Sequence, residues 1–270
     1  MDIVLLTLGN TIDKTFFSFD FAIFEFFGNI QCGFLNIIAK IFTAFGDEAF
    51  VIPMIVLGAV LMLFKKTRKY GFALFFAIIV GTLITNVLVK PMALRIRPYN
   101  TLQEYADYMG WYNFAGAFSE SDYSFPSGHT TAAFEMATAL FLVFRSNGKK
   151  KICWLFPVIA VLTMCSRVYL MVHYPTDVLA GMLVGILAGV IGFFLMKLCM
   201  KLITDVKLFK WIDNIDLAKI KLFGWTEGKG GAFAVAVIAV AFFCISFIPA
   251  LSEGGDTAVR CAYNEEYDCY

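Results

Sequence analysis

Both histidines of the chain, His129 and His173, stand near side chains that could assist them in nucleophilic and acid–base chemistry. Asp177 follows His173 by four residues, and Pro175 between them allows a helix to begin there. A carboxylate that binds one imidazole nitrogen fixes the tautomer and leaves the other nitrogen free as a nucleophile. His129 is then available to supply a proton, so the two histidines predict a site with a nucleophile and an acid.

Three cationic side chains, Lys90, Arg97 and Arg167, could bind an anion at the same site. The planar donor fork of arginine matches the oxygens of a phosphate. Lys90 and Arg97 are seven residues apart, close to two helical turns, so we expect them on one face of a helix. Arg95 falls on another face and is left out of the predicted site. Taken alone, Lys90 and Arg97 could equally reach to the membrane interface.

The stretch Pro126-Ser127-Gly128-His129 is typical of a helix start. Free N–H groups and the positive end of the helix dipole favour anions at such a place. Gly128 lets the backbone approach an anion closely, and the Ser127 hydroxyl can add a donor. An ordinary proline-led helix start explains the same residues.

The elements that position these residues must lie in a membrane, because the composition is strongly apolar. Of the 270 residues, 60% are hydrophobic and 16% are charged. A soluble domain carries roughly a quarter charged residues. Charged side chains at bilayer depth are costly and mark functional sites. The net charge of +1 gives no reason to expect a nucleic-acid partner.

Apolar stretches divide the chain into membrane-spanning segments. A hydrocarbon core of about 30 Å needs roughly 20 helical residues. The predicted spans cover residues 50–64, 70–89, 129–144, 152–172, 177–198 and 231–250. The expected fold is an all-α, polytopic membrane bundle of about six transmembrane helices.

The distribution of basic residues predicts the orientation of the bundle. Lys and Arg cluster at 65–69, 145–151 and 199–230, and such clusters stay on the cytoplasmic side of a membrane. The number of spans puts all three segments on that side. The candidate site residues then meet at the outer face of the cell membrane, with the acidic loop at 99–125 and the acidic tail at 251–270. Their convergence on one face favours a single site.

Residues 16–45 are apolar but interrupted by Asp20, Glu25 and Lys40. We expect amphipathic helices on the outer surface, and a seventh span is the alternative. The expected organisation begins with an N-terminal interfacial region at 1–49 and a core with the three polar motifs at 50–198. A basic cytoplasmic linker at 199–230, a further transmembrane helix at 231–250 and an acidic outer tail at 251–270 follow.

Three further side chains carry expectations of their own. Cys261 and Cys269 lie in the predicted outer tail, where they could form a disulfide or stay reduced. Glu135 lies within a predicted span, where a carboxylate usually pairs. It could brace Arg167 or Lys90, or it could bond to a neighbouring helix.

The order, spacing and types of these residues resemble a known enzyme family. The motifs are Lys90-x6-Arg97-Pro98, Pro126-Ser127-Gly128-His129 and Ser166-Arg167-x5-His173-x3-Asp177. They are similar to the three signature motifs of the type 2 phosphatidic acid phosphatase family, which is related to vanadium haloperoxidases and to the membrane glucose-6-phosphatases. The resemblance covers about residues 50–198, and no motif residue is missing.

The resemblance implies a role for each motif residue. His173 would attack phosphorus and form a phosphohistidine, Asp177 would orient His173, and His129 would protonate the leaving oxygen. The phosphoryl oxygens would be held by Lys90, Arg97, Ser127, Gly128 and Arg167. The family needs no metal, and no cofactor is expected.

The resemblance implies a metal-independent membrane phosphatase that hydrolyses a lipid phosphate or diphosphate. Candidate substrates are phosphatidic acid, phosphatidylglycerol phosphate and a polyprenyl diphosphate such as undecaprenyl diphosphate. Two alternatives remain open: a lipid phosphotransferase that uses the same site, and a non-catalytic lipid-binding or transport protein. The sequence does not predict the oligomeric state.

Overall fold

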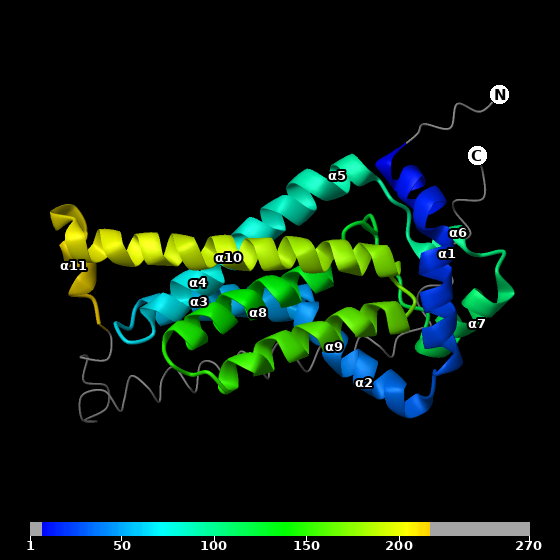
Figure 1. The fold of residues 1–270 in the computed structure, drawn as a ribbon, viewed down its shortest axis with the longest axis horizontal. Helices are drawn as coiled ribbons and strands as arrows, with labels where there is room; N and C mark the ends of the chain where they lie inside the picture. Colours follow the sequence, from blue (N-terminus) through cyan, green and yellow to red (C-terminus); the bar gives the residue numbers. More distant parts are fainter. Residues whose placement is uncertain (1–6, 217–270) are drawn as a thin grey trace.

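The computed structural model describes residues 7–216, and every regular element in that range is helical (Figure 1). The elements are, in chain order, α1 (Leu8–Asn29), α2 (Gly33–Thr43), η1 (Ala44–Gly46), α3 (Glu48–Met62), α4 (Arg68–Thr82), η2 (Leu83–Val89), α5 (Lys90–Ala93), α6 (Pro98–Thr101), α7 (Ala106–Ala115), α8 (Gly128–Ser146), η3 (Ile152–Trp154), α9 (Leu155–Tyr169), α10 (Pro175–Asp205), η4 (Lys207–Phe209) and α11 (Lys210–Asp213). The all-α prediction is confirmed. The predicted span at 231–250 and the Cys261–Cys269 pair lie outside the described residues.

The core of the bundle is formed by α10, which packs along both α4 and α8 (Figure 1). Glycines on α10 allow this close approach. A Cβ added to Gly185 would lie 2.6 Å from the Thr131 carbonyl oxygen of α8. A Cβ added to Gly192 would lie 2.6 Å from the Ala77 nitrogen of α4. Small residues bring helices together in this way inside membranes, where the packing of backbones stabilises a bundle.

Three helical stretches in the described part of the chain are long and apolar enough to cross a membrane: Arg68–Thr101, Ile152–Tyr169 and Pro175–Asp205. The bent pair Gly33–Gly46 and Glu48–Met62, with 43° between its halves, would make a fourth span. The expected count of six is not confirmed. The predicted span in α8 is not among these stretches, because α8 is enclosed by α4, α9 and α10 and needs little lipid-facing surface.

The helix that begins at Arg68 changes its character towards the site. It passes through the π-helical stretch η2 into α5, and it ends where Leu94 adopts a left-handed conformation with φ 50°. Residues 94–97 are therefore not helical. The prediction that Lys90 and Arg97 share one face of a helix is wrong, because the helix ends between them.

The N-terminal helices lie at and beside one end of the bundle. The helix α1 crosses the end at which α10 begins, and α2 runs along α9 (Figure 1). The inner side of α1 buries Asp20 and Phe24, whereas Phe16 and Phe26 on its outer side are exposed. An apolar outer side and a polar inner contact are consistent with a helix at the membrane interface.

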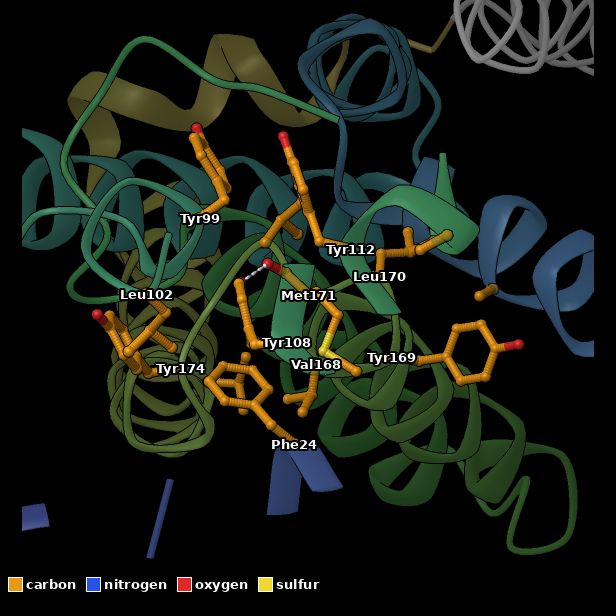
Figure 2. Packing of buried hydrophobic residues seen from close by; sticks show 14 residues of the cluster. Phe24, Tyr99, Leu102, Tyr108, Tyr112, Val168, Tyr169, Leu170, Met171 and Tyr174 are labelled. Atoms are coloured by element: carbon orange, nitrogen blue, oxygen red, sulfur yellow. Dashed lines mark hydrogen bonds between the residues drawn. The ribbon is translucent and has the colours of Figure 1, made fainter. Parts of the chain in front are cut away.

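An aromatic cluster holds the segment that connects α9 to α10 (Figure 2). Tyr108 of α7 is fully buried and donates a hydrogen bond of 2.5 Å to the Met171 carbonyl oxygen. Phe24 of α1 packs edge-on against the Tyr108 ring with centroids 5.1 Å apart. Burial and the neighbouring tyrosines raise the pKa of Tyr108 well above its ordinary value, so its hydroxyl remains a donor. The cluster therefore fixes the backbone that carries His173.

Candidate active site

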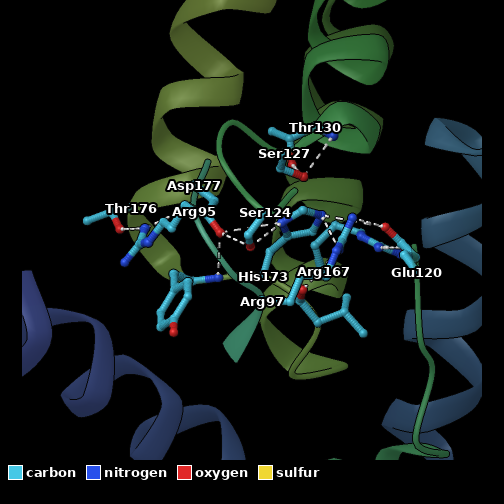
Figure 3. Close-up of polar contacts among 12 residues, drawn as sticks. Arg95, Arg97, Glu120, Ser124, Ser127, Thr130, Arg167, His173, Thr176 and Asp177 are labelled. Atoms are coloured by element: carbon cyan, nitrogen blue, oxygen red, sulfur yellow. Dashed lines mark hydrogen bonds and ion pairs between the residues drawn. The ribbon is translucent and has the colours of Figure 1, made fainter. Parts of the chain in front are cut away.

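His173 lies in the short connection between α9 and α10 and is completely buried (Figure 3). Its Nε2 atom is 3.1 Å from Nη1 of Arg97. Its Nδ1 atom is 3.3 Å from the Ser124 hydroxyl and 3.5 Å from Oδ2 of Asp177. A guanidinium can only donate, so Nε2 must be the acceptor and the ring proton must sit on Nδ1. The lone pair of Nε2 faces the cationic side of the site.

The charge state of His173 follows from these surroundings. Burial and the positive charges of Arg97 and Arg167 hold the pKa of His173 well below its ordinary value. The imidazole is therefore neutral at physiological pH. A neutral ring with an unprotonated Nε2 is the form that can act as a nucleophile.

Asp177 lies in the first turn of α10, which begins at Pro175 as the sequence predicts. Its Oδ2 atom accepts hydrogen bonds from the Ser124 hydroxyl at 2.5 Å and from the Tyr174 backbone N–H at 3.1 Å. Its Oδ1 atom accepts a hydrogen bond of 2.6 Å from Nη1 of Arg95. Both oxygens are thus bound, and one of them is aimed at the Nδ1 side of His173.

The three predicted phosphate-binding cations converge beside His173, and each is nearly buried. They do not face an empty space, because two carboxylates of the loop before α8 reach into it. Arg97 lies 2.5 Å from Oε2 of Glu120, and Arg167 forms an ion pair with the other oxygen of the same carboxylate. Lys90 and Arg97 both form ion pairs with Asp122. The two carboxylates thus provide the oxygen atoms that these cations bind in the structure.

Glu120 lies 3.9 Å from the Nε2 atom of His173. Burial alone would raise its pKa, but the positive charges of Arg167, His129 and Arg97 hold the pKa well below its ordinary value. The position therefore favours an anion strongly. Sequence reasoning placed Glu120 only in an acidic outer loop, because no periodicity predicts which way a loop side chain points.

The Pro126-Ser127-Gly128-His129 stretch begins α8 as predicted. The Ser127 side chain caps the helix by accepting a bond of 3.4 Å from the Thr130 backbone N–H. Its backbone N–H donates to the Asp177 carbonyl oxygen at 3.1 Å, which ties this turn to the start of α10. Lys90 passes close to Gly128, since a Cβ there would lie 3.5 Å from Nζ of the lysine.

His129 faces a partner that the sequence did not suggest. Its Nε2 atom lies 3.5 Å from Oδ2 of Asp47, the residue that caps the start of α3. A Cβ on Gly46 would lie 2.7 Å from the His129 Cα, so the chain before α3 passes directly over this histidine. Asp47 belongs to the region before the three motifs, and motif spacing therefore gives no signal for it.

Arg95 occupies a position that sequence reasoning did not predict. A helical continuation past Lys90 would turn Arg95 away from the site, but the helix ends at Ala93. Its guanidinium instead bonds to Asp177, as described above. The left-handed residue Leu94 redirects the chain, and no helical periodicity applies beyond it.

Glu135 forms neither of the pairings expected for it. It is buried in α8, and its Oε2 atom has no hydrogen-bond partner among the described residues. The carboxylate faces Gly81 of α4, where any Cβ would collide with it. No hydrogen bond or ion pair joins it to the cations around His173 among the described residues.

A cavity of about 1040 Å³ adjoins this cluster. At one end it is bordered by Lys90, Glu120, Asp122 and His129. It continues between α3, η2 and α8, where its lining combines Val51, Ile52 and Ile55 of α3 with the polar side chains of Thr85, Asn86 and Glu135. The apolar part of the cavity wall is therefore the α3 side. Within residues 7–216, no three His, Cys, Asp or Glu side chains come together in a way that could hold a metal ion.

Comparison with known proteins identifies the family. A family model described as the PAP2 superfamily matches residues 70–201. Phosphatidylglycerophosphatase B of Bacillus subtilis is 36% identical over 176 residues, which cover 62% of this chain and 76% of that protein. An undecaprenyl-diphosphatase of Sulfolobus acidocaldarius is 32% identical over 168 residues, which cover 62% of this chain and 73% of that protein.

A solved structure supports the same relation. The crystal structure of a transmembrane PAP2-type phosphatidylglycerolphosphate phosphatase from Bacillus subtilis matches with a TM-score of 0.56 and 31% identity. The match covers 74% of this chain and 94% of that one. Sequence, fold and membrane-spanning helices thus agree, and the chain is an integral membrane protein that belongs to the PAP2 superfamily.

Proposed function

We propose that this protein is a metal-independent phosphatase that cleaves a lipid phosphate or diphosphate through a phosphohistidine on His173. The observation that carries the proposal is the neutral, buried imidazole whose Nε2 atom faces Arg97 while Nδ1 faces Asp177. A nucleophile held in one tautomer beside a group of cations is the arrangement that phosphoryl transfer from an anionic ester requires. The named relatives are phosphatases of lipid phosphates and diphosphates.

In the first step the substrate phosphoryl group takes the place of the Glu120 and Asp122 carboxylates among the cations. The Nε2 lone pair of His173 attacks phosphorus, so the N–P bond forms while the P–O bond to the leaving group breaks. His129 transfers a proton to the leaving oxygen, and it borders the same cavity as Lys90 and Glu120. Asp177 balances the positive charge that develops on the imidazole of His173.

In the second step water attacks the phosphohistidine. His129, now neutral, accepts the proton of that water, the N–P bond breaks, and inorganic phosphate leaves. Lys90, Arg97 and Arg167 stabilise the charge on the equatorial oxygens in both steps. These cations supply the positive charge that a divalent ion provides in other phosphatases, so no metal is required.

The shape of the cavity supports an amphiphilic substrate. The charged residues Lys90 and His129 border the part that would hold a phosphate, and the apolar side chains of α3 would contact the start of a hydrocarbon chain. Phosphatidic acid, phosphatidylglycerol phosphate and a polyprenyl diphosphate such as undecaprenyl diphosphate meet this requirement.

We place the site at the outer face of the membrane. The basic loops at 65–69 and 145–151 lie at the end of the bundle opposite to α1 and the start of α10 (Figure 1). Basic segments of this kind remain in the cytoplasm. If they do so here, His173 faces the outer side.

The test is an assay of the purified protein against a panel of lipid phosphates in excess chelator. We expect release of inorganic phosphate and, after rapid quenching in base, an acid-labile phosphohistidine that is missing in His173→Ala. Phosphate release that depends on an added divalent ion would contradict the proposal. Transfer of the phosphoryl group to an added acceptor lipid, in place of water, would identify a phosphotransferase instead.

A further inference from the structure

The N-terminal helix α1, which precedes the residues matched by the family model, contacts Asp177 through Arg95. Arg95 is 1% exposed, and its guanidinium binds four side chains. Nη1 donates to Asp177 at 2.6 Å and to the Thr176 hydroxyl at 2.7 Å. Nη2 donates to Asp20 at 2.9 Å, and Nε donates to Asp13 at 2.8 Å. Two of these partners come from the start of α10 and two from α1.

Asp20 makes the connection rigid because it binds α10 as well as Arg95. It is 2% exposed. Its Oδ1 atom accepts a bond of 2.9 Å from the Thr176 backbone N–H, and its Oδ2 atom accepts one of 2.8 Å from the Thr176 hydroxyl. Asp20, Arg95 and Thr176 therefore form a closed ring of hydrogen bonds, and Thr176 is the residue before Asp177.

The guanidinium plane is held from its flat side as well. Its Cζ atom lies 3.8 Å from the centre of the Tyr174 ring. A Cβ on Gly9 of α1 would lie 2.6 Å from the Cα atom of Arg95, so the first turn of α1 lies directly on this backbone. Arginine stacked in this way loses little further freedom when it binds a carboxylate, which suits it to orient another group.

This ring bears on the chemistry through the charge of Asp177. A buried carboxylate without a partner is strongly disfavoured, and Asp177 is completely buried. Its Oδ2 atom is occupied by Ser124 and the Tyr174 N–H, which leaves Oδ1 for Arg95. Arg95 in turn is a buried cation that pairs with the carboxylates of Asp177, Asp20 and Asp13, and Asp20 is the fully enclosed partner on α1, with 2% exposure.

We propose that Arg95 and Asp20 are positioning residues for the reaction: together they keep Asp177 ionised and aimed at Nδ1 of His173. The inference rests on the proposed function, because it assigns them to the step in which His173 attacks phosphorus. It makes α1 part of the catalytic apparatus. All four polar contacts of Arg95 point away from the phosphate-binding cations, so Arg95 does not bind substrate.

The test is a double-mutant cycle in the full-length protein, with Asp20→Asn, Asp177→Asn and the combined variant. Glu25→Gln is the matched control, since it removes an exposed carboxylate from the same helix. We expect Asp20→Asn to lower kcat about tenfold with KM nearly unchanged, as loss of the hydrogen-bond partner of a metal-binding histidine or carboxylate lowers activity by about 10–100-fold in metalloenzymes. In the Asp177→Asn background the same change should cost less than twofold, since its effect passes through Asp177.

Folding is checked separately by size-exclusion chromatography and thermal unfolding. Thr176→Val provides a second variant, because it removes the two hydroxyl contacts in the ring without changing any charge; it should lower kcat in the same direction by a smaller factor. The proposal is overturned if Asp20→Asn is as active as Glu25→Gln, if its cost is the same with and without Asp177, or if it weakens competitive inhibition by inorganic phosphate.

Failure of the proposed function has a different signature. In that case the unmodified protein forms no phosphohistidine, or Asp177→Asn retains full activity. If only the positioning role is wrong, the unmodified protein still forms the phosphohistidine and Asp177→Asn still has a lower kcat.

Discussion

At the scale of single residues, the donors around His173 decide its chemistry. Arg97 can only donate, so Nε2 carries the lone pair and Nδ1 carries the proton. The four-residue spacing to Asp177 is enough to predict their contact, because Pro175 begins a helix and places Asp177 in its first turn. The sequence could not reveal that Ser124 also lies between the two groups. That contact depends on where a loop returns to the site.

The two histidines should differ in their response to the leaving group. His173→Ala should be inactive on both a lipid phosphate and p-nitrophenyl phosphate, because no phosphoenzyme forms. His129→Ala should lose about 10²–10⁴-fold on the lipid phosphate, where a basic oxygen must be protonated as it leaves. It should keep a measurable share of the p-nitrophenyl reaction. Steady-state rates on the two substrates test this, and the opposite pattern would exchange the two roles.

The neutral state of His173 should be visible in stability as well as in rate. Its pKa in the folded protein lies well below the ordinary value of 6.5, so the unfolded chain binds a proton that the folded protein excludes. Stability should therefore fall progressively as the pH drops below about 6.5, where the unfolded chain begins to bind this proton. His173→Gln should reduce this loss. Thermal unfolding in detergent at pH 5 and at pH 7.5 measures it, and identical pH dependence in both proteins would contradict the assignment.

At the scale of elements, the loop before α8 has the strongest influence on the site. The local sequence pattern, with its apolar stretches and a proline-led turn, predicted the spans at α4, α9 and α10 and the start of α8. It failed between Lys90 and Arg97, where left-handed Leu94 ends the helix. It also gave no position for Glu120 and Asp122, which bind the same cations as the expected phosphate. Loop conformation depends on distant charges, which a local pattern does not contain.

These carboxylates should compete with the substrate. Glu120→Gln removes the charge that pairs with Arg97 and Arg167. It should therefore lower both the KM for the lipid phosphate and the inhibition constant of inorganic phosphate. Each should fall about tenfold when the lost ion pairs contribute about 1.4 kcal/mol. Glu104→Gln, which changes an exposed carboxylate in the segment between α6 and α7, is the control. Kinetics at pH 7 test the effect, and a raised KM would instead make Glu120 a substrate-binding group.

At the scale of the whole molecule, the single helix α10 extends from the end of the bundle where Asp177 lies to the opposite end. It has 31 residues, which at 1.5 Å per residue is about 46 Å, longer than a hydrocarbon core of about 30 Å. Its ends therefore lie at or beyond the two membrane surfaces. The motifs predicted that His173 and Asp177 lie together at one end of the bundle, and they do. The predicted number of spans is not confirmed, because the stretch at 129–144 forms the enclosed helix α8, which is not among the helices that are apolar enough to cross a membrane.

Labelling should report the orientation. Single cysteines at Asn113 in α7 and at Lys150 beyond α8, in a background without accessible thiols, occupy opposite ends of the bundle. An impermeant thiol reagent added to intact cells should label position 113 and leave position 150 unlabelled until the cells are opened. The reverse result would move the active site to the cytoplasmic face.

The cavity beside His129 has a consequence for how the protein meets its substrate. Ile52 of α3 lines it and is also 59% exposed, so the cavity has an apolar border that a lipid chain can contact. A lipid can then arrive by lateral diffusion within its own leaflet, without first leaving it. The relevant concentration is two-dimensional: the rate should follow the mole fraction of lipid phosphate in the surface, and neutral detergent should slow the reaction by surface dilution even when the total amount of substrate per volume is constant.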